Sequence, residues 1–146
     1  MTVDEIFENW NVDCKIDQLD LGNAALQIPK LHNKYLHFLS NEKRDLRKLE
    51  KQLKKFRLLK TEYFSGQLNG TDELKKLGWE PYQKVLLKNV ISEYVDSEDD
   101  VQKLSLMVEE QRDKVETLEF ILKEILSRNF IIKSAIDWRK FTEGIN

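Results

Sequence analysis

Residues 29–66 read PKLHNKYLHFLSNEKRDLRKLEKQLKKFRLLKTEYFSG. Apolar or amphipathic side chains recur in this stretch at steps of three and four residues. This is the heptad pattern of a helix that packs lengthwise against another helix. The positions, two of them occupied by charged residues, are Tyr35, Leu39, Glu42, Leu46, Leu49, Leu53, Phe56, Lys60 and Tyr63. The pattern predicts one long helix over about 29–65, ended by Gly66.

The predicted helix is strongly basic, although the whole chain has a net charge of -2. Between Pro29 and Lys60, eleven lysines and arginines stand against three acids. Residues 1–22 carry six acids against one lysine, and residues 93–119 carry ten acids against three basic residues. Blocks of alternating sign favour contacts between segments of the chain, or a basic face that receives an anion.

A second heptad pattern follows Asp96 and Ser97, which we expect to cap a helix over about 97–126. Its positions again step by three and four residues: Val101, Leu104, Val108, Gln111, Val115, Leu118, Leu122 and Ile125. Gln111 either fixes the register as a buried polar group or lies in a partly exposed seam. We expect the two long helices to form an antiparallel hairpin over residues 29–126, within a mainly α protein.

The remaining segments lie at the two ends and between the long helices. Thr2 and Glu5 fit a capping box for a short amphipathic helix in an acidic segment, 1–28. This helix docks either on its own fold or on a sister subunit, or it binds a partner. Residues 85–95 are rich in β-branched and aromatic types, so we predict a short extended segment there.

Residues 127–146 are predicted to hold a C-terminal helix over about 128–142. Its apolar groups outnumber those that an isolated tail exposes, so they form either the core of this chain or a contact between chains. The residues assigned to such an oligomer contact are Phe130, Ile131, Ala135, Trp138 and Phe141.

No enzyme motif is found in the sequence. It holds no phosphate-cradling GxxxxGK loop, no HExxH and no GxSxG, so we expect no catalytic residue, no metal site and no cofactor. Cys14 is the one cysteine, which excludes a disulfide within one chain and favours a reducing, intracellular site. No apolar run approaches the roughly 18 residues of a membrane span, so no contact with a membrane is expected.

The candidate binding element lies at the end of the basic helix. It comprises Lys54, Lys55, Arg57, Lys60, Tyr63 and Phe64. Basic groups neutralise phosphates, and aromatic rings stack on unpaired bases, so this element favours binding of a nucleic acid with unpaired bases. The alternative is that Tyr63 completes the heptad seam and the basic face pairs with the acidic second helix. The protein is then a coiled-coil scaffold or adaptor without DNA binding.

Three features together resemble the UvsY-type recombination mediators of T-even-type bacteriophages. The first is a basic helix that runs into Lys60 and the run Tyr63-Phe64-Ser65-Gly66. The second is an ending that contains Ser127-Arg128-Asn129-Phe130, Ile132-Lys133, Asp137, Arg139, Phe141 and Glu143-Gly144. The third is the overall length and order of the chain. The likeness is strongest at residues 60–66 and 127–144.

The resemblance implies a non-enzymatic protein that binds single-stranded DNA in the cytoplasm of an infected host cell. Such mediators help a RecA-like recombinase replace the single-strand-binding protein on DNA, and they contact both proteins. The resemblance also implies a homo-oligomeric ring, hexameric or heptameric, assembled through the C-terminal segment. The family's basic pair before the aromatic element falls on Lys60 and Leu58. Leu58 departs from that pattern, and Arg57 is the neighbouring basic residue.

Overall fold

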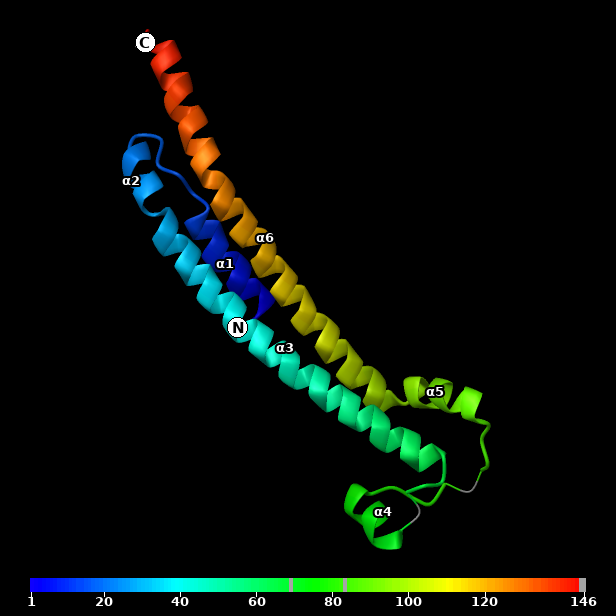
Figure 1. Ribbon diagram of the computed structural model, residues 1–146. Helices are drawn as coiled ribbons and strands as arrows, with labels where there is room; N and C mark the ends of the chain where they lie inside the picture. The colour runs from blue at the N-terminus through cyan, green and yellow to red at the C-terminus, as the bar shows by residue number, and fades with distance from the viewer. Residues whose placement is uncertain (69, 83, 145–146) are drawn as a thin grey trace. The chain divides into compact units, whose positions relative to one another are not determined.

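The computed structural model describes residues 1–68, 70–82 and 84–144. The regular elements found in these residues are all helices, which confirms the mainly α class (Figure 1). They are α1 (Val3–Asp13), α2 (Leu21–Leu26), α3 (Ile28–Phe64), α4 (Thr71–Leu77), α5 (Lys88–Ser97) and α6 (Asp99–Thr142). The chain forms two compact units. Unit 1 is Met1–Arg44 with Arg112–Asn146, and unit 2 is Asp45–Gln111, so α3 and α6 each contribute to both.

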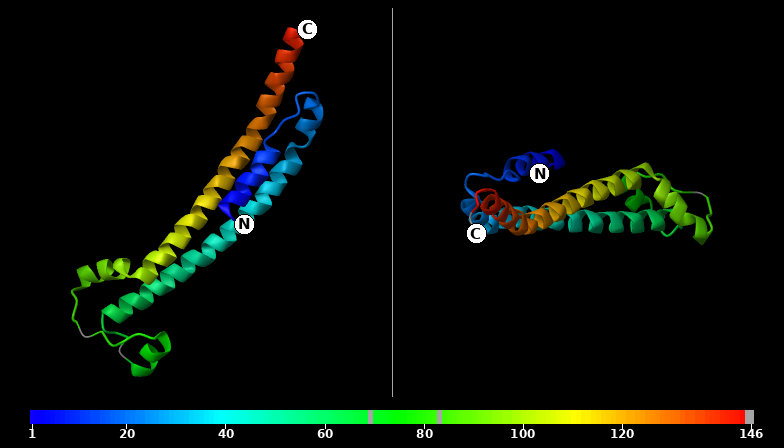
Figure 2. Two further views of the ribbon diagram at one scale, coloured as in Figure 1. Left: turned by 180° about the vertical axis from the view of Figure 1, so that it is seen from behind. Right: turned by 90° about the horizontal axis from the view of Figure 1, so that it is seen from above.

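In unit 1, α1 lies beside the first part of α3 and the second part of α6 (Figures 1 and 2). The predicted capping box begins α1: the Glu5 amide donates to Thr2 Oγ1 at 3.1 Å, and the Thr2 amide donates to Glu5 Oε2 at 2.7 Å. Ile6 is fully buried, and Trp10 makes an edge contact with the Tyr35 ring at 5.5 Å. The N-terminal helix therefore docks on its own fold.

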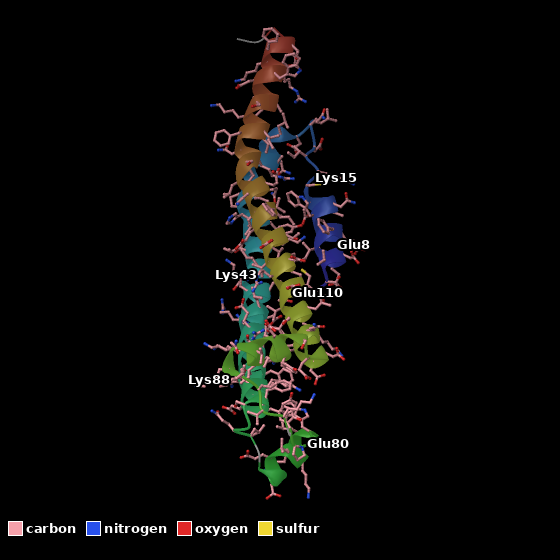
Figure 3. The ribbon with its side chains drawn as sticks, turned by 90° about the vertical axis from the view of Figure 1, so that its right-hand side faces the viewer. Glu8, Lys15, Lys43, Glu80, Lys88 and Glu110 are labelled. Carbon is pink, nitrogen blue, oxygen red and sulfur yellow. The ribbon has the colours of Figure 1, made fainter. Side chains whose placement is uncertain are left out.

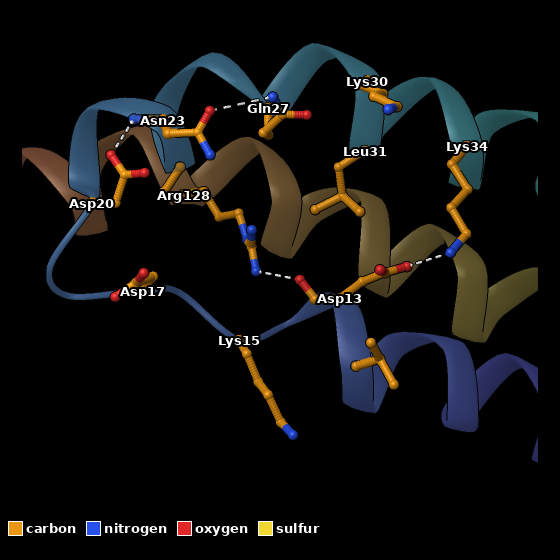
Figure 4. A pocket seen from close by; sticks show the side chains of 12 residues that line it. Asp13, Lys15, Asp17, Asp20, Asn23, Gln27, Lys30, Leu31, Lys34 and Arg128 are labelled. Atoms are coloured by element: carbon orange, nitrogen blue, oxygen red, sulfur yellow. Dashed lines mark hydrogen bonds and ion pairs between the residues drawn. The ribbon is translucent and has the colours of Figure 1, made fainter.

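Asp13, the last residue of α1, is joined to both long helices (Figure 4). Its carboxylate accepts hydrogen bonds from Lys34 Nζ at 2.6 Å and from the Tyr35 hydroxyl at 3.0 Å. Its carbonyl accepts from Arg128 Nη2 at 2.6 Å. Burial, and then the bond to Asp13, hold the pKa of Tyr35 well above its ordinary value. Asp13, Lys34 and Arg128 line a cavity of about 470 Å³. Because these residues bind one another, we interpret them as an anchor that holds α1 to the long helices.

In unit 2, the second part of α3 and the first part of α6 run side by side in opposite directions (Figures 1 and 2). The α3 helix ends at Phe64, and Gly66 follows with a positive φ of 81°, which suits the predicted glycine stop. The core of this unit joins Phe64, Ile91, Val95 and Val101. The core of unit 2 therefore packs around the end of α3.

The extended segment predicted over residues 85–95 is wrong from Lys88 onward, because Lys88–Ser97 form α5. Ile91 and Val95 are four residues apart, and both are buried in the core around Phe64. Helical spacing and tertiary packing thus override the β-propensity of the individual residues. Residues 84–87 carry no regular structure.

The break predicted near residue 127 is also absent, because α6 continues from Asp99 to Thr142. Ser127, Arg128 and Asn129 include neither Gly nor Pro, and a helix passes through them at little cost. The start of α6 differs slightly from the expected position at residue 97. Glu98 lies between α5 and α6 with extended backbone (φ -65°, ψ 131°).

Both heptad patterns identify buried positions. In α6, the buried members are Val101, Val108, Gln111, Val115, Leu118, Leu122 and Ile125. Gln111 is 6% exposed, so the alternative of a partly exposed seam is wrong at this residue. In α3, the two charged members are buried as well: Glu42 is 5% exposed and Lys60 is 4% exposed.

Among the residues described, no helix combines the length and the apolar character needed to cross a membrane. The same ranges contain no group of three or more His, Cys, Asp or Glu side chains that could hold a metal ion. Cys14 is a free, exposed cysteine.

Candidate nucleic-acid interface

A basic stripe lies on the part of α3 that belongs to unit 2. It consists of Arg47, Lys51, Lys54 and Lys55, spaced i, i+4, i+7 and i+8, so the four side chains share one face of the helix. All four are exposed, and none forms an ion pair with a residue that the structure describes. The next position of this face is Leu58, which is 60% exposed. The stripe is therefore a positive surface open to phosphates.

The two other predicted cations, Arg57 and Lys60, are paired with acids at the junction of α5 and α6. Arg57 Nη1 lies 2.6 Å from Asp96 Oδ1. Lys60 Nζ lies 3.3 Å from Glu98 Oε2 and 4.0 Å from Asp100 Oδ2. Lys60 is buried because it occupies a seam position of α3. The predicted basic element thus divides into an exposed part and a paired part.

Aromatic rings surround the Lys60 ammonium on its other sides. Its Nζ lies 4.0 Å from the centroid of the Trp79 ring, 5.7 Å from that of Phe56 and 5.9 Å from that of Tyr63. A cation over an aromatic face is attracted by the negative centre of the ring. We call Lys60, Phe56, Tyr63 and Trp79 the lysine cage.

Tyr63 and Phe64 are both held by the connection between α4 and α5. The Tyr63 hydroxyl donates to the carbonyl of Glu80, a residue labelled in Figure 3, and burial raises the pKa of this hydroxyl above its ordinary value. Phe64 is 4% exposed and contacts the Tyr82 ring at 5.0 Å. Phe64 is a core residue in this structure, whereas Tyr63 is half-buried.

The structure brings together Lys60, Tyr63 and Phe64 of the predicted site and places Lys54 and Lys55 on the exposed stripe. Sequence reasoning did not select Arg47 and Lys51, although their helical spacing from Lys54 and Lys55 is a usable signal. The residues that contact Lys60, Tyr63 or Phe64 also include Trp79, Tyr82 and Glu98. These three residues come from distant parts of the chain, so no local pattern identifies them.

The predicted oligomer face lies on the C-terminal part of α6. Phe130 is 72% exposed, Trp138 is 66% exposed and Phe141 is 77% exposed, and the last two rings stack with centroids 5.8 Å apart. Ile131 is also exposed, and Ala135 is half-buried. Ile132 and Arg128, in the same part of the helix, are buried. The apolar face is therefore not core of the described chain.

Comparison with known proteins gives consistent results. The chain is 26% identical over 144 residues to the recombination protein uvsY of Enterobacteria phage T4, covering 99% of both chains. Two crystal structures of the bacteriophage T4 recombination mediator protein UvsY share the fold. The first matches with a TM-score of 0.84 at 24% identity, covering 98% of each chain. The second matches with a TM-score of 0.84 at 23% identity, covering 97% of this chain and 99% of the other.

The profile of one protein family, described as the recombination, repair and ssDNA binding protein UvsY, matches residues 9–145. This range contains the basic stripe, the lysine cage and the exposed C-terminal face. The chain therefore belongs to the UvsY family.

Proposed function

We propose that this protein is a recombination mediator that binds single-stranded DNA. In this proposal it promotes loading of a RecA-like recombinase onto DNA covered by single-strand-binding protein, in the cytoplasm of the infected host cell. It acts by binding, without catalysing a reaction. Membership of the UvsY family supports the role in recombination.

The observation that carries the proposal is the basic stripe. Four cationic side chains on one face of α3 remain exposed and free of internal ion pairs within the described ranges. Each can neutralise a phosphate and release its counterion, which favours binding at low salt. Tyr63 lies at the end of the same helix, and its half-buried ring keeps part of its surface exposed to an unpaired base. Stacking of this kind favours a single strand over a duplex.

The proposal includes a homo-oligomer, hexameric or heptameric, assembled through Phe130, Ile131, Ala135, Trp138 and Phe141. The large exposed apolar area on α6 supports this assembly, because a face of this kind marks an interaction surface. Several copies of the basic stripe on one strand act as linked binding sites. Linkage raises the apparent affinity well above that of one stripe.

The proposed DNA site is tested by the triple variant Lys51→Gln, Lys54→Gln, Lys55→Gln. Affinity for a single strand is expected to fall at least about tenfold at low salt. The slope of log K against log salt should become shallower by about 2, from roughly 0.7 for each lost phosphate contact. Binding is measured by fluorescence anisotropy with a labelled oligothymidylate.

The matched control is the triple variant Lys75→Gln, Lys76→Gln, Lys84→Gln. It removes the same charge from exposed lysines of unit 2 that lie outside the stripe. Its salt slope should stay close to that of the unchanged protein. Equal losses in the two variants would show that only net charge matters, and the proposed site would then be wrong.

The mediator step needs a separate assay. A RecA-like recombinase hydrolyses ATP on single strands, and bound single-strand-binding protein delays this activity. We expect the protein to shorten the delay, and the stripe variant to lose that effect while the control variant keeps it. A protein that binds DNA yet leaves the delay unchanged would contradict the mediator role and favour a scaffold function.

A further inference from the structure

Three acids at the α5–α6 junction converge on the paired cations of α3. Asp96 lies near the end of α5, Glu98 lies between the helices and Asp100 lies in the first turn of α6. The helix break at Glu98 turns the chain so that the three carboxylates, from positions two residues apart, reach two neighbouring cations. Arg57 forms an ion pair with Asp96, and Lys60 forms ion pairs with Glu98 and Asp100.

This arrangement separates the cations of one helix into two classes. The stripe residues, such as Lys54 and Lys55, are exposed and unpaired within the described part of the chain, whereas Arg57 and Lys60 are held by carboxylates. A carboxylate and a phosphate offer the same kind of charged oxygen acceptor to a lysine or an arginine. The junction acids therefore occupy the cations in the way that DNA phosphates would.

We propose that Asp96, Glu98 and Asp100 compete with DNA phosphates for Arg57 and Lys60. When a single strand binds, these two cations exchange the carboxylates for phosphates. We call the three acids the junction acids. The inference rests on the proposed function, because it describes the regulation of that same site. It assigns the stripe to the first contact with DNA and the paired cations to a second, slower contact.

The geometry permits this exchange. The Glu98 side chain is 36% exposed, and those of Asp96 and Asp100 are 54% and 67% exposed, so solvent reaches the acids of both pairs. The Lys60 ammonium sits on a flexible four-carbon stem, which lets the charge move while the helix stays in place. The Trp79 ring holds the ammonium only through an electrostatic attraction that hydration can replace. The Lys60 side chain itself is 5% exposed, so its ammonium has to leave the lysine cage to reach a phosphate.

The test is the affinity of the full chain for oligothymidylate after removal of one competitor. Glu98→Gln frees Lys60, and Asp96→Asn frees Arg57. Each variant is expected to bind the single strand about two- to fivefold more tightly than the unchanged protein, from the usual strength of such ion pairs. Asp96→Asn breaks a surface pair, so it tests the proposal even where the loss of Glu98 disturbs folding.

The control is Glu93→Gln, which removes an exposed acid of α5 that makes no ion pair within the described ranges. It changes the net charge by the same amount, so its effect measures long-range attraction alone. In a Lys60→Met background, Glu98→Gln should give no gain beyond that of Glu93→Gln. Methionine keeps an apolar stem in the cage and removes the charge.

Gains in Glu98→Gln and Asp96→Asn that exceed the control support the competitor, provided that the gain of Glu98→Gln depends on Lys60. Gains equal to that of Glu93→Gln, or a gain of Glu98→Gln that persists in the Lys60→Met background, would overturn it. These outcomes differ from failure of the proposed function. In that case the unchanged protein itself shows no salt-sensitive binding to a single strand.

Discussion

Lys60 Nζ lies 4.0 Å from the centroid of the Trp79 ring and 3.3 Å from Glu98 Oε2. The lysine occupies a seam position of α3, and it is satisfied there by a ring and a carboxylate from distant segments. A seam residue stabilises packing, whereas a DNA contact has to reach solvent. The position of Lys60 therefore links the packing of unit 2 to its proposed function.

Release of Lys60 should be visible in the fluorescence of Trp79. The variant Trp10→Phe, Trp138→Phe leaves Trp79 as the remaining tryptophan. Because the ammonium leaves the ring on DNA binding, the emission should change with the same midpoint as the anisotropy signal. In a Lys60→Met background the change should be much smaller. Emission that stays constant while DNA binds would show that the cage remains closed.

Removal of the Asp13 carboxylate should destabilise unit 1. Asp13→Ala leaves the buried Tyr35 hydroxyl and Lys34 without their acceptor, and we expect a loss of about 2–3 kcal/mol in the free energy of unfolding. Urea denaturation at one fixed protein concentration measures this loss. Glu8→Ala, at an exposed position on the outer side of α1 (Figure 3), should cost less than about 0.5 kcal/mol. Equal losses in the two variants would contradict the anchor.

Tyr35 should make stability sensitive to alkaline pH. Its pKa is raised in the folded protein, so the folded state keeps a proton that the unfolded chain loses near pH 10. The contribution of Tyr35 to the free energy of unfolding is therefore fully present below about pH 10. It falls by about 1.4 kcal/mol per pH unit as the pH rises from there toward the folded pKa. Tyr35→Phe should remove this contribution. Identical alkaline slopes of urea stability for the two proteins would contradict it.

The C-terminal face should control assembly. Trp138→Glu or Phe141→Glu places a charge on the exposed apolar face of α6, and we expect each to shift the protein from oligomer to monomer. Sedimentation velocity gives the mass. The control Lys140→Glu adds an acid at an exposed position between these two residues and should retain the oligomer. An unchanged mass in both face variants would refute this interface.

The elements with strong local signals were predictable from the sequence. Thr2 and Glu5 predict the start of α1, because a capping box needs only those two residue types at that spacing. The seam of α3 is equally local, since each position follows from the heptad step. It placed Lys60 at a buried position, in conflict with a role as an exposed DNA contact. In the structure Lys60 is 4% exposed and is paired with Glu98 and Asp100.

The elements that depend on tertiary packing were not predictable in the same way. The β-branched residues of α5 favour a strand locally, and only their burial against Phe64 stabilises a helix. Trp79 and Glu98 approach Lys60 from 19 and 38 residues away in sequence. No periodicity predicts such contacts. The exposed stripe could have been predicted from the sequence, because Arg47 and Lys51 follow the same helical spacing as Lys54 and Lys55.

The most direct test of the central claim is fluorescence anisotropy with the unchanged protein. A labelled single strand and a duplex of equal length are compared at low and at moderate salt. We expect tighter binding to the single strand, weakened steeply by salt, because the basic stripe contacts phosphates and Tyr63 favours unpaired bases. Absence of binding to the single strand even at low salt would contradict the account and favour a scaffold without DNA binding.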